Sequence, residues 1–453
     1  MPPAAFDSAI FGPLAADPAT RELFSDAAVV QAMLDVEAAL ARAEADTGVI
    51  SADTAQAIER ASKAIQIDMD SLAARTLDDG VPVPALVAEL RAQVAGDAAS
   101  HVHYGATSQD ILDTALMLRL KKVLDLHSTA LLALGTSIAD LARSHRLTPM
   151  AGRTRMQQAA PVSFGLKAGG WLSAVCRHLE QVNRLRQTCL CVSLSGATGN
   201  LAVLGVTGLD VERALAARLG LSVPLSPWHV YRDRLLELSG WWALVSGTLG
   251  KIGTDLVLLA QNEVGEVRLA GGSSSTLPNK ANPVGAELLI ALARHNAGLL
   301  GTAHQAALQE HERGGAGWTL EWLSLPQMAM TTGAALFHAN RLFGGLEIDA
   351  ARMRANLNVS NGLLLAEALG FELARHLPRE SAPAVVKEAC ARVVRQKTSL
   401  TAATKDILRE QNLDQVIADV DWERVTDPAQ HLGASGALID RILESFESLA
   451  GRF

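Results

Sequence analysis

Residues 235–259 read LLELSGWWALVSGTLGKIGTDLVLL and hold the most regular apolar pattern of the chain. Large apolar residues recur there at alternating spacings of three and four, at Leu235, Leu238, Trp242, Val245, Leu249, Ile252, Leu256 and Leu259. This spacing places them on one side of an α-helix and is typical of helices that pack side by side. At about 1.5 Å per residue, the helix is expected to exceed about 36 Å. A helix of this length must bury its apolar side against other helices.

Four other stretches predict long helices, at 111–145, 161 to about 188, 283 to about 299, and 320–342. Strand-type alternation is almost absent, and aromatic residues make up only 4% of the chain, which argues against a β-sandwich. We therefore predict an all-α fold with a central bundle of five long helices. If the apolar sides are wider than one chain can cover, the bundle will associate with copies of itself.

Shorter segments on either side of the bundle predict two smaller helical domains. Residues 1–20 contain four prolines and are expected to form an extended arm. Ser25 and Ser51 are placed to cap the starts of two helices, the first of which should end at Gly48. We predict an N-terminal helical domain over 1–110, the long-helix bundle over 111–345, and a C-terminal helical domain over 346–453.

Charge and cysteine content argue against several classes of protein. The 453 residues include 40 Lys and Arg and 48 Asp and Glu, a net charge of −8, so no overall positive field attracts nucleic acid. The four cysteines fit no zinc-binding spacing and are too few for a disulfide framework. No secretory signal and no uninterrupted apolar run of about 18 residues is evident. We expect a cytoplasmic protein that binds no metal.

A glycine- and serine-rich loop, GGSSSTLPNKANP at 271–283, interrupts the long helices. Glycines let the backbone approach a ligand closely, and Lys280 offers a positive charge to an anion. A flexible linker has a similar composition. The two prolines of the loop, and the regular helices predicted on either side, favour a binding loop over a linker.

Two further segments combine polar side chains with non-helical backbone. In HVHYGATSQD at 101–110, Thr107 and Ser108 precede a predicted helix, and the start of a helix can be a simple cap or an anion site. In GRTRMQQ at 152–158, Arg153 and Arg155 are two residues apart, a spacing that exposed surface arginines also show. The residues by themselves leave both alternatives open.

These segments resemble motifs of the fumarase/aspartase superfamily, and the resemblance covers nearly the whole chain. The loop is similar to a Gly-Ser-Ser-x-x-Met-Pro-x-Lys-x-Asn-Pro pattern, with matches at Pro278, Lys280, Asn282, Pro283 and, four residues on, Glu287. Leu277 stands where methionine is usual, and Ser273 stands where glycine is usual. Counting back from the first proline identifies Ser274 as the catalytic serine of the family, whereas a one-residue insertion would identify Ser273.

The family's His-x-Gly-x-Thr-Ser-x-Asp motif is matched at His103, Gly105, Thr107, Ser108 and Asp110, and its Thr-Ser pair holds a substrate carboxylate. A Gly-x-Thr-His-x-Gln motif is matched at Gly152, Thr154 and Gln157, but Arg155 replaces the histidine. In the lyases that histidine helps to protonate the leaving nitrogen or oxygen. Arginine cannot supply a proton, whereas its guanidinium stabilises a carboxylate well. Arg155 therefore favours a reaction that makes or breaks a C–O bond to a carboxylate.

A fourth segment, QEHERGG at 309–315, is followed by two tryptophans and resembles the cycloisomerase branch of the superfamily. This resemblance makes Arg313 a candidate carboxylate ligand. It implies a cofactor-free 3-carboxy-cis,cis-muconate cycloisomerase of aromatic catabolism, which acts on a small polycarboxylate and needs neither nucleic acid nor a membrane. It also implies a homotetramer with a twenty-helix core, in which each active site draws loops from three subunits.

Predicted catalytic residues are Ser274, Ser275, Arg155 and Glu287, the last of which pairs with the acid histidine in relatives and would pair with Arg155 here. Predicted substrate-binding residues are His103, Thr107, Ser108, Arg153, Thr154, Gln157, Lys280, Asn282, His311 and Arg313. Either His103 or His311 could serve as a general acid. Two other functions fit less well: an adenylosuccinate- or argininosuccinate-type lyase that releases fumarate, and a non-catalytic structural protein such as the lens crystallins with this fold.

Overall fold

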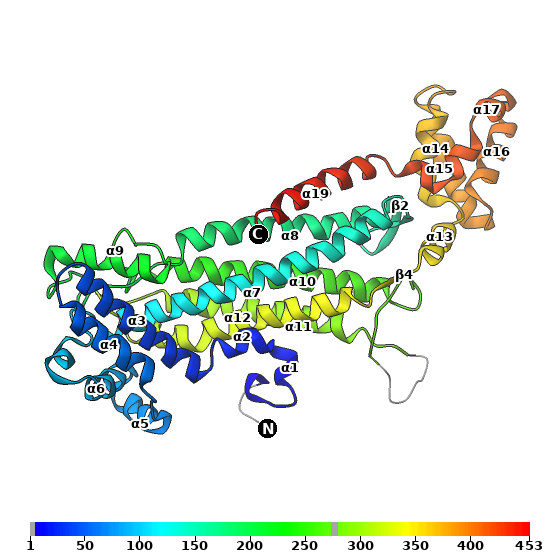
Figure 1. The fold of residues 1–453 in the computed structure, drawn as a ribbon. Coiled ribbons are helices and arrows are strands. Elements are labelled where there is room, and N and C mark those ends of the chain that lie inside the picture. Colours follow the sequence, from blue (N-terminus) through cyan, green and yellow to red (C-terminus); the bar gives the residue numbers. More distant parts are fainter. Residues whose placement is uncertain (1–4, 273–279) are drawn as a thin grey trace. The chain divides into compact units, whose positions relative to one another are not determined.

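The computed structural model describes residues 5–272 and 280–453, and Figure 1 follows the chain by colour. Internal contacts divide the chain into two compact units. The first contains Met1–Leu131, His178–Gly250 and Leu288–His338, and the second contains Leu132–Arg177, Lys251–Glu287 and Ala339–Phe453. The three-domain borders expected at 110 and 345 stay a prediction.

The five predicted long helices are present, and the fold is mainly helical. They are α7 (Ser108–Ser144), α8 (Phe164–Thr188), α10 (Asp233–Leu259), α11 (Val284–Ala306) and α12 (Ala316–Phe343). The apolar pattern that predicted α10 is buried along its length, since none of its eight residues is more than 4% exposed. One predicted start is wrong. Residues 161–163 belong to a strand, and α8 begins only at Phe164, because Ala151 and Pro161 are paired in a hairpin.

The first unit begins with short helices where an extended arm was expected. Pro13 and Pro18 lie in the first turns of α1 and α2, where a missing N–H removes no hydrogen bond. The expected caps are confirmed: Ser25 accepts from the backbone of Ala28 at 3.2 Å, and Ser51 accepts from Thr54 at 3.1 Å. Its shorter elements are η1 (Ala5–Asp7), α1 (Gly12–Ala15), α2 (Pro18–Glu22), α3 (Asp26–Asp46), α4 (Ala52–Ala64), α5 (Met69–Asp79), α6 (Val83–Gln93), η2 (Gly96–His101), η3 (Gly205–Thr207) and α9 (Gly208–Leu219).

Within the first unit, a buried asparagine joins three of the long helices. The side-chain amide of Asn296 on α11 donates to the Ser246 hydroxyl of α10 at 3.2 Å and to the Thr332 hydroxyl of α12 at 2.9 Å. Asn296 is fully buried, so these bonds satisfy donors that water cannot reach. The polar contact therefore sets how these helices align inside an otherwise apolar interface.

The second unit contains two small sheets and a separate apolar core formed by α14–α18. Its elements are β1 (Pro149–Thr154), β2 (Gln157–Ser163), β3 (Val267–Arg268), β4 (Glu347–Ile348), α13 (Ala350–Asn358), η4 (Leu363–Leu365), α14 (Ala366–Leu373), α15 (Ser381–Gln396), α16 (Leu400–Glu410), α17 (Asp414–Asp419), α18 (Trp422–Thr426), η5 (Pro428–His431) and α19 (Ser435–Ala450). Strand β1 pairs with β2 and β3 pairs with β4, both antiparallel. Buried leucine, valine and alanine side chains fill the core between the short helices.

Among the described residues, α10 alone has the length and composition of a membrane-crossing helix. Half of its most apolar window is buried inside the chain, and the core helices of water-soluble bundles meet the same criteria. The finding is therefore weak evidence for a membrane span, and we interpret α10 as a core helix.

A buried acid on α3 makes stability depend on pH. Glu44 is fully buried, and neither of its carboxyl oxygens has a hydrogen-bond partner among the described residues. Burial, with a smaller contribution from the charge of Glu37, raises the pKa of Glu44 to about 9. Between about pH 4.5 and pH 9, the Glu44 carboxyl is thus protonated in the folded protein but ionised in the unfolded chain, where its pKa is near 4.5. The contribution of Glu44 to stability must therefore fall as the pH rises from about 4.5 to about 9.

We expect Glu44→Gln to remove this dependence, because glutamine is neutral at every pH. The difference in unfolding free energy between the variant and the unmodified protein should increase, in favour of the variant, by roughly 2–4 kcal/mol as the pH rises from 5 to 8. Urea unfolding at both pH values measures the difference. Equal gains at pH 5 and pH 8 would show that Glu44 titrates normally.

Candidate active site

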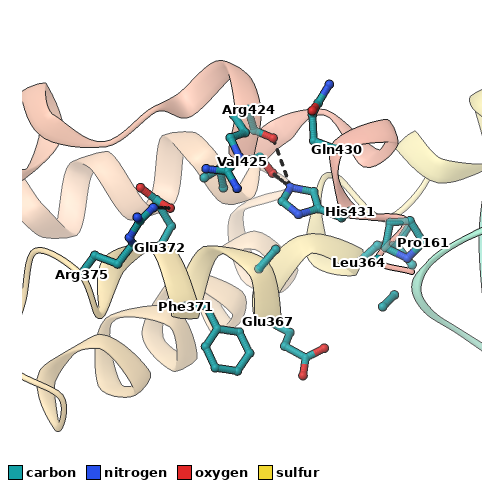
Figure 2. A pocket seen from close by; sticks show the side chains of 13 residues that line it. Pro161, Leu364, Glu367, Phe371, Glu372, Arg375, Arg424, Val425, Gln430 and His431 are labelled. Atoms are coloured by element: carbon teal, nitrogen blue, oxygen red, sulfur yellow. Dashed lines mark hydrogen bonds and ion pairs between the residues drawn. The ribbon is translucent and has the colours of Figure 1, made fainter. Parts of the chain in front are cut away.

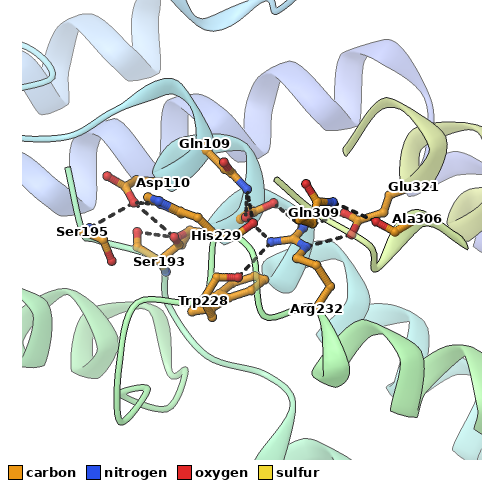
Figure 3. Close-up of polar contacts among 12 residues, drawn as sticks. Gln109, Asp110, Ser193, Ser195, Trp228, His229, Arg232, Ala306, Gln309 and Glu321 are labelled. Atoms are coloured by element: carbon orange, nitrogen blue, oxygen red, sulfur yellow. Dashed lines mark hydrogen bonds and ion pairs between the residues drawn. The ribbon is translucent and has the colours of Figure 1, made fainter. Parts of the chain in front are cut away.

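Asp110 organises the start of α7 in the first unit (Figure 3). Its fully buried carboxylate accepts hydrogen bonds from the backbone N–H groups of Thr107, Ser195 and Gly196, each at 3.0 Å. The imidazole of His229 lies 2.7 Å away. These partners satisfy the hydrogen-bonding capacity of a carboxylate that water cannot reach. Asp110 therefore joins the first turn of α7 to the loop at 193–196 and to the segment before α10.

One helical turn further, an ion triad fixes the same region (Figure 3). The buried guanidinium of Arg232 donates to Asp113 at 2.7 and 3.0 Å and to Glu321 at 2.8 and 2.6 Å. It also lies 4.7 Å from the centre of the Trp228 ring. Burial disfavours the charged form, but the neighbouring carboxylates outweigh it and raise the pKa of Arg232. The triad locks α7, the start of α10, and α12 together.

This framework brings together two predicted ligands that are 206 residues apart in sequence. The guanidinium of Arg313, in the loop before α12, donates to the Thr107 hydroxyl at 2.8 Å. Thr107 and Ser108 are half-buried at the start of α7, and Arg313 is exposed. His311 in the same loop is also exposed and has a left-handed backbone, with φ +48°. A cation, two hydroxyls and a helix N-terminus at one place can bind a carboxylate.

Gly105 allows this loop to pack closely. Its φ is +72°, a left-handed conformation that favours glycine, and a Cβ atom here would lie 2.6 Å from Cγ of Leu204. The family motif includes a glycine at this position, but it does not reveal the contact with Leu204 that requires one. The loop therefore lies directly against the segment at 196–204.

In the second unit, the hairpin of β1 and β2 presents Arg155 at its tip. Thr154 pairs with Gln157, and the two residues between them, Arg155 and Met156, have φ of +50° and +65°. Two left-handed residues are typical of the tight type I′ hairpin turn. The side chains of Thr154, Arg155 and Gln157 are all exposed, and Arg155 makes no ion pair with the residues that the structure describes. The hairpin therefore leaves the guanidinium available to an anion.

Arg153 occupies a different place from its neighbour. Its guanidinium donates to both oxygens of the buried Glu266 carboxylate, at 2.9 and 2.7 Å. Asn356 of α13 donates to the same carboxylate at 2.8 Å. These contacts join the hairpin to the segment after α10 and to α13. We propose that Arg153 holds the hairpin in place and that Arg155 is the arginine that contacts substrate.

The structure describes only the two ends of the predicted catalytic loop. Gly272 has φ +79° and accepts a hydrogen bond from the backbone N–H of Asn282 at 2.6 Å, and a Cβ on Gly272 would collide with the Asn282 carbonyl. This contact closes the neck of the loop. Lys280 is exposed, and Asn282 is half-buried. Ser273, Ser274 and Ser275 lie outside the described residues.

Glu287 is exposed in the first turn of α11, where a carboxylate is favoured by the helix dipole. Within the described part of the chain it forms no ion pair with Arg155. Its pairing with that arginine therefore stays a prediction.

The second unit contains several cavities, two of which have volumes of about 590 and 630 Å³. The smaller of these two is lined mainly by α14, α18 and η5 and contains Arg375, Arg424 and His431 (Figure 2). The larger adjoins the neck of the loop and includes Ala281 and Pro283. Neither cavity contains a predicted site residue, so neither is by itself the predicted active site.

Sequence reasoning missed several residues that support the site. Glu37 contacts His103, Glu266 holds Arg153, and Glu321 holds Arg232. A signal for the first was available. Glu37 falls on the same side of its predicted helix as Met33 and Leu40, and a charged residue in an apolar stripe needs a partner. The partners themselves are 66 to 113 positions away and could not be read from local pattern.

Comparison with known proteins identifies the family. A family model described as lyase matches residues 14–298. The chain is 44% identical over 436 residues to 3-carboxy-cis,cis-muconate cycloisomerase of Pseudomonas aeruginosa, covering 95% of this chain and 94% of that protein. It is 33% identical to N-acetyl-S-(2-succino)cysteine lyase of Dickeya dadantii, over 94% of each chain.

A solved structure agrees with these sequence matches. The 3-carboxy-cis,cis-muconate lactonizing enzyme of Pseudomonas putida superposes with a TM-score of 0.91 at 39% identity, covering 98% of this chain and 100% of that one. The helical fold is thus shared along nearly the full length of both chains. The chain belongs to the lyase family of the fumarase/aspartase superfamily.

Proposed function

We propose that the chain is a 3-carboxy-cis,cis-muconate cycloisomerase, which closes a lactone by adding a substrate carboxylate to a double bond. The observation that carries this function is Arg155, exposed at the hairpin tip, at the position where the lyase motif that this segment resembles has histidine. A guanidinium can stabilise the attacking carboxylate but cannot protonate a leaving amine or hydroxide. The similarity to cycloisomerases over nearly the whole chain supports the same reaction.

In the proposed reaction, one carboxylate oxygen of the substrate forms the new C–O bond. The electron pair of the double bond moves to the carbon beside a second carboxylate, which becomes an aci-carboxylate. Cationic, hydroxyl and amide groups, contributed by Thr107, Ser108, Thr154, Lys280, Asn282 and Arg313, stabilise this negative charge. Ser274 then transfers its proton to the carbanionic carbon, and surrounding positive charge stabilises the alkoxide that remains. The reaction needs no cofactor.

We further propose that the sites form in a homotetramer, with a core of twenty helices and loops from three subunits. Several large apolar residues of α10 and α12 are exposed in the single chain, among them Leu244 at 56% and Leu323 at 60%. Exposed apolar side chains on bundle helices are typical of surfaces that bind other subunits. Light scattering coupled to gel filtration tests the assembly, and a monomer would contradict it.

The protein is proposed to act in the cytoplasm. All four cysteines are free thiols, as expected for a reducing compartment. Burial raises the pKa of Cys189 to about 12 and that of Cys191 to about 11, so these two thiols stay protonated and unreactive.

The decisive experiment is incubation of the protein with 3-carboxy-cis,cis-muconate. Lactonisation consumes the conjugated diene, so its ultraviolet absorbance should fall. The NMR spectrum of the product should contain the signal of a carbon that is newly bonded to the ring oxygen. Unchanged absorbance would contradict the proposed function. It would also be the result expected of a non-catalytic structural protein.

Arg155→His tests the residue that distinguishes this function. We expect the substitution to lower kcat/KM for lactonisation roughly 10–100-fold, because a charge-assisted hydrogen bond of about 1.5–3 kcal/mol is lost. Arg143→His, at an exposed ion pair with Asp140 and Glu447, is the matched control and should change kcat/KM little. Full activity in Arg155→His would remove Arg155 from the reaction.

An elimination that releases fumarate is the second candidate, because a relative at 33% identity is a succino-adduct lyase. Fumarate released from a succinylated amine or thiol would favour it over lactonisation. Arg155 argues against the release of an amine, since that leaving group would need a proton and arginine cannot supply one.

A further inference from the structure

Glu37 is a buried acid that the proposed chemistry does not use. It lies on α3 and is 1% exposed, among apolar neighbours that include Met33, Val36 and Leu40. One carboxyl oxygen, Oε1, lies 2.6 Å from Nδ1 of His103, which is 66 residues away in sequence. A buried charge is costly unless it is paired, so the contact with His103 is what makes Glu37 tolerable at this position.

Contacts with neighbouring residues also constrain the backbone around His103. His103 has φ +63°, a left-handed conformation that is rare for a residue with a Cβ and costs about 1–3 kcal/mol. The preceding Val102 is fully buried, and its carbonyl accepts a hydrogen bond from the Arg91 guanidinium at 3.0 Å. Strain of this kind persists only where several contacts enforce it, and it is common at functional sites.

The second ring nitrogen of His103 is left for other contacts. Nε2 has no hydrogen-bond partner among residues 5–272 and 280–453, and the side chain is 15% exposed. His103 lies in the loop that leads to Thr107 and Ser108, and Arg313 contacts Thr107. The ring is thus fixed at one nitrogen and open at the other, in the loop that carries the candidate carboxylate ligands Thr107 and Ser108.

The charges around the ring favour the imidazolium. Burial lowers the pKa of His103, but the charge and hydrogen bond of Glu37 act the other way, and Asp110 adds to them. Arg91 opposes them more weakly, and the resulting pKa is raised. Glu44 lies two turns along α3 from Glu37. Because its pKa is raised to about 9, it is protonated near neutral pH and adds no charge there.

We propose that Glu37 is a positioning residue for His103: its carboxylate accepts a hydrogen bond from Nδ1–H and keeps the ring cationic, so that Nε2–H can donate to a substrate carboxylate bound beside Thr107. This inference rests on the proposed function, because it concerns the same site. Histidines that bind a ligand through one nitrogen are commonly oriented by a carboxylate on the other.

The first test is NMR of histidine-labelled protein, with the His103 signals assigned by their loss in His103→Asn. Glu37→Gln keeps the size of the side chain and removes its charge, so the titration midpoint of His103 should fall by at least one pH unit. Glu44→Gln is the matched control on the same helix and should leave the midpoint within about 0.3 units, because Glu44 is already neutral. An unchanged midpoint in Glu37→Gln would overturn the proposal.

The second test is kinetic. If His103 acts as a cation, kcat/KM of the unmodified protein should decline on the alkaline side with the midpoint that NMR gives for His103. In Glu37→Gln this limb should shift to lower pH by the same amount, with KM raised more than kcat is lowered. A uniform loss at every pH, with the limb in its original position, would indicate a merely structural role and contradict the inference.

Two outcomes separate this inference from the proposed function. If the unmodified protein does not lactonise 3-carboxy-cis,cis-muconate, the proposed function fails, but the NMR titration still decides whether Glu37 controls His103. If Glu37→Gln does not fold, the nitrogen shifts of the unmodified protein give the answer. A neutral His103 that carries its proton on Nε2 and not on Nδ1 would contradict the Glu37 contact.

Discussion

Ser274→Ala is expected to lower kcat for lactonisation roughly 10²–10⁴-fold, the usual contribution of a positioned proton donor. In the proposed reaction, no other group delivers the proton to the carbon that carries the negative charge. Alanine removes one hydroxyl and changes little else, so the amount of assembled protein should not change. The diene absorbance assay measures kcat, and light scattering checks the assembly.

Ser273→Ala is the matched control, because it removes the same group one position earlier. The motif count places the catalytic serine at Ser274, whereas a one-residue insertion in the loop would place it at Ser273. A large loss in Ser273→Ala with normal activity in Ser274→Ala would therefore support the insertion. Near-full turnover in both variants would exclude a serine at these positions as the proton donor.

Arg232→Met should cause the largest loss of stability, about 3–5 kcal/mol of unfolding free energy. The substitution leaves the carboxylates of Asp113 and Glu321 buried without their cation (Figure 3). Even beside Arg232, burial raises the pKa of Glu321. Without the guanidinium, which opposes this rise, Glu321 should take up a proton more readily, so the loss should be smaller at pH 5 than at pH 8. Urea unfolding at the two pH values measures both effects.

Arg143→Met is the control for this prediction, since Arg143 forms exposed ion pairs with Asp140 and Glu447. Exposed pairs contribute about 0–1 kcal/mol, so this variant should unfold almost like the unmodified protein. A loss below about 1 kcal/mol in Arg232→Met would mean that the buried triad is not a main constraint on the start of α7.

Local pattern was enough to find the long helices, because each buries a regular apolar side over many turns. Errors arose where local chemistry has two outcomes. The prolines of residues 1–20 predicted an extended arm. Pro13 and Pro18 instead lie in the first turns of short helices, because proline fits a first turn as well as a loop. Pro161 was assigned to a helix, yet it pairs in the β1–β2 hairpin, and only the partner strand decides that.

For the candidate site too, the sequence identified residues, but the structure was needed to show which of them are paired. The sequence placed Arg153 and Arg155 together in one predicted site, as two arginines of one segment. The structure separates them, because Glu266, 113 residues away from Arg153, neutralises that arginine, whereas the turn leaves Arg155 exposed. Resemblance also named His103 but not Glu37, because a motif records residues close in sequence and the partner lies on another helix.

The sequence by itself determined the helical class, the long-helix bundle, the family, and the substitution of Arg155 that favours cyclisation over elimination. These follow from side-chain periodicity and from the chemistry of single residues at recognisable positions. Only the tertiary structure decided which charges are paired: Arg232 with Asp113 and Glu321, and His103 with Glu37. The reason is physical. A residue's charge is encoded locally, but its effect depends on burial and on partners that folding brings from distant parts of the chain.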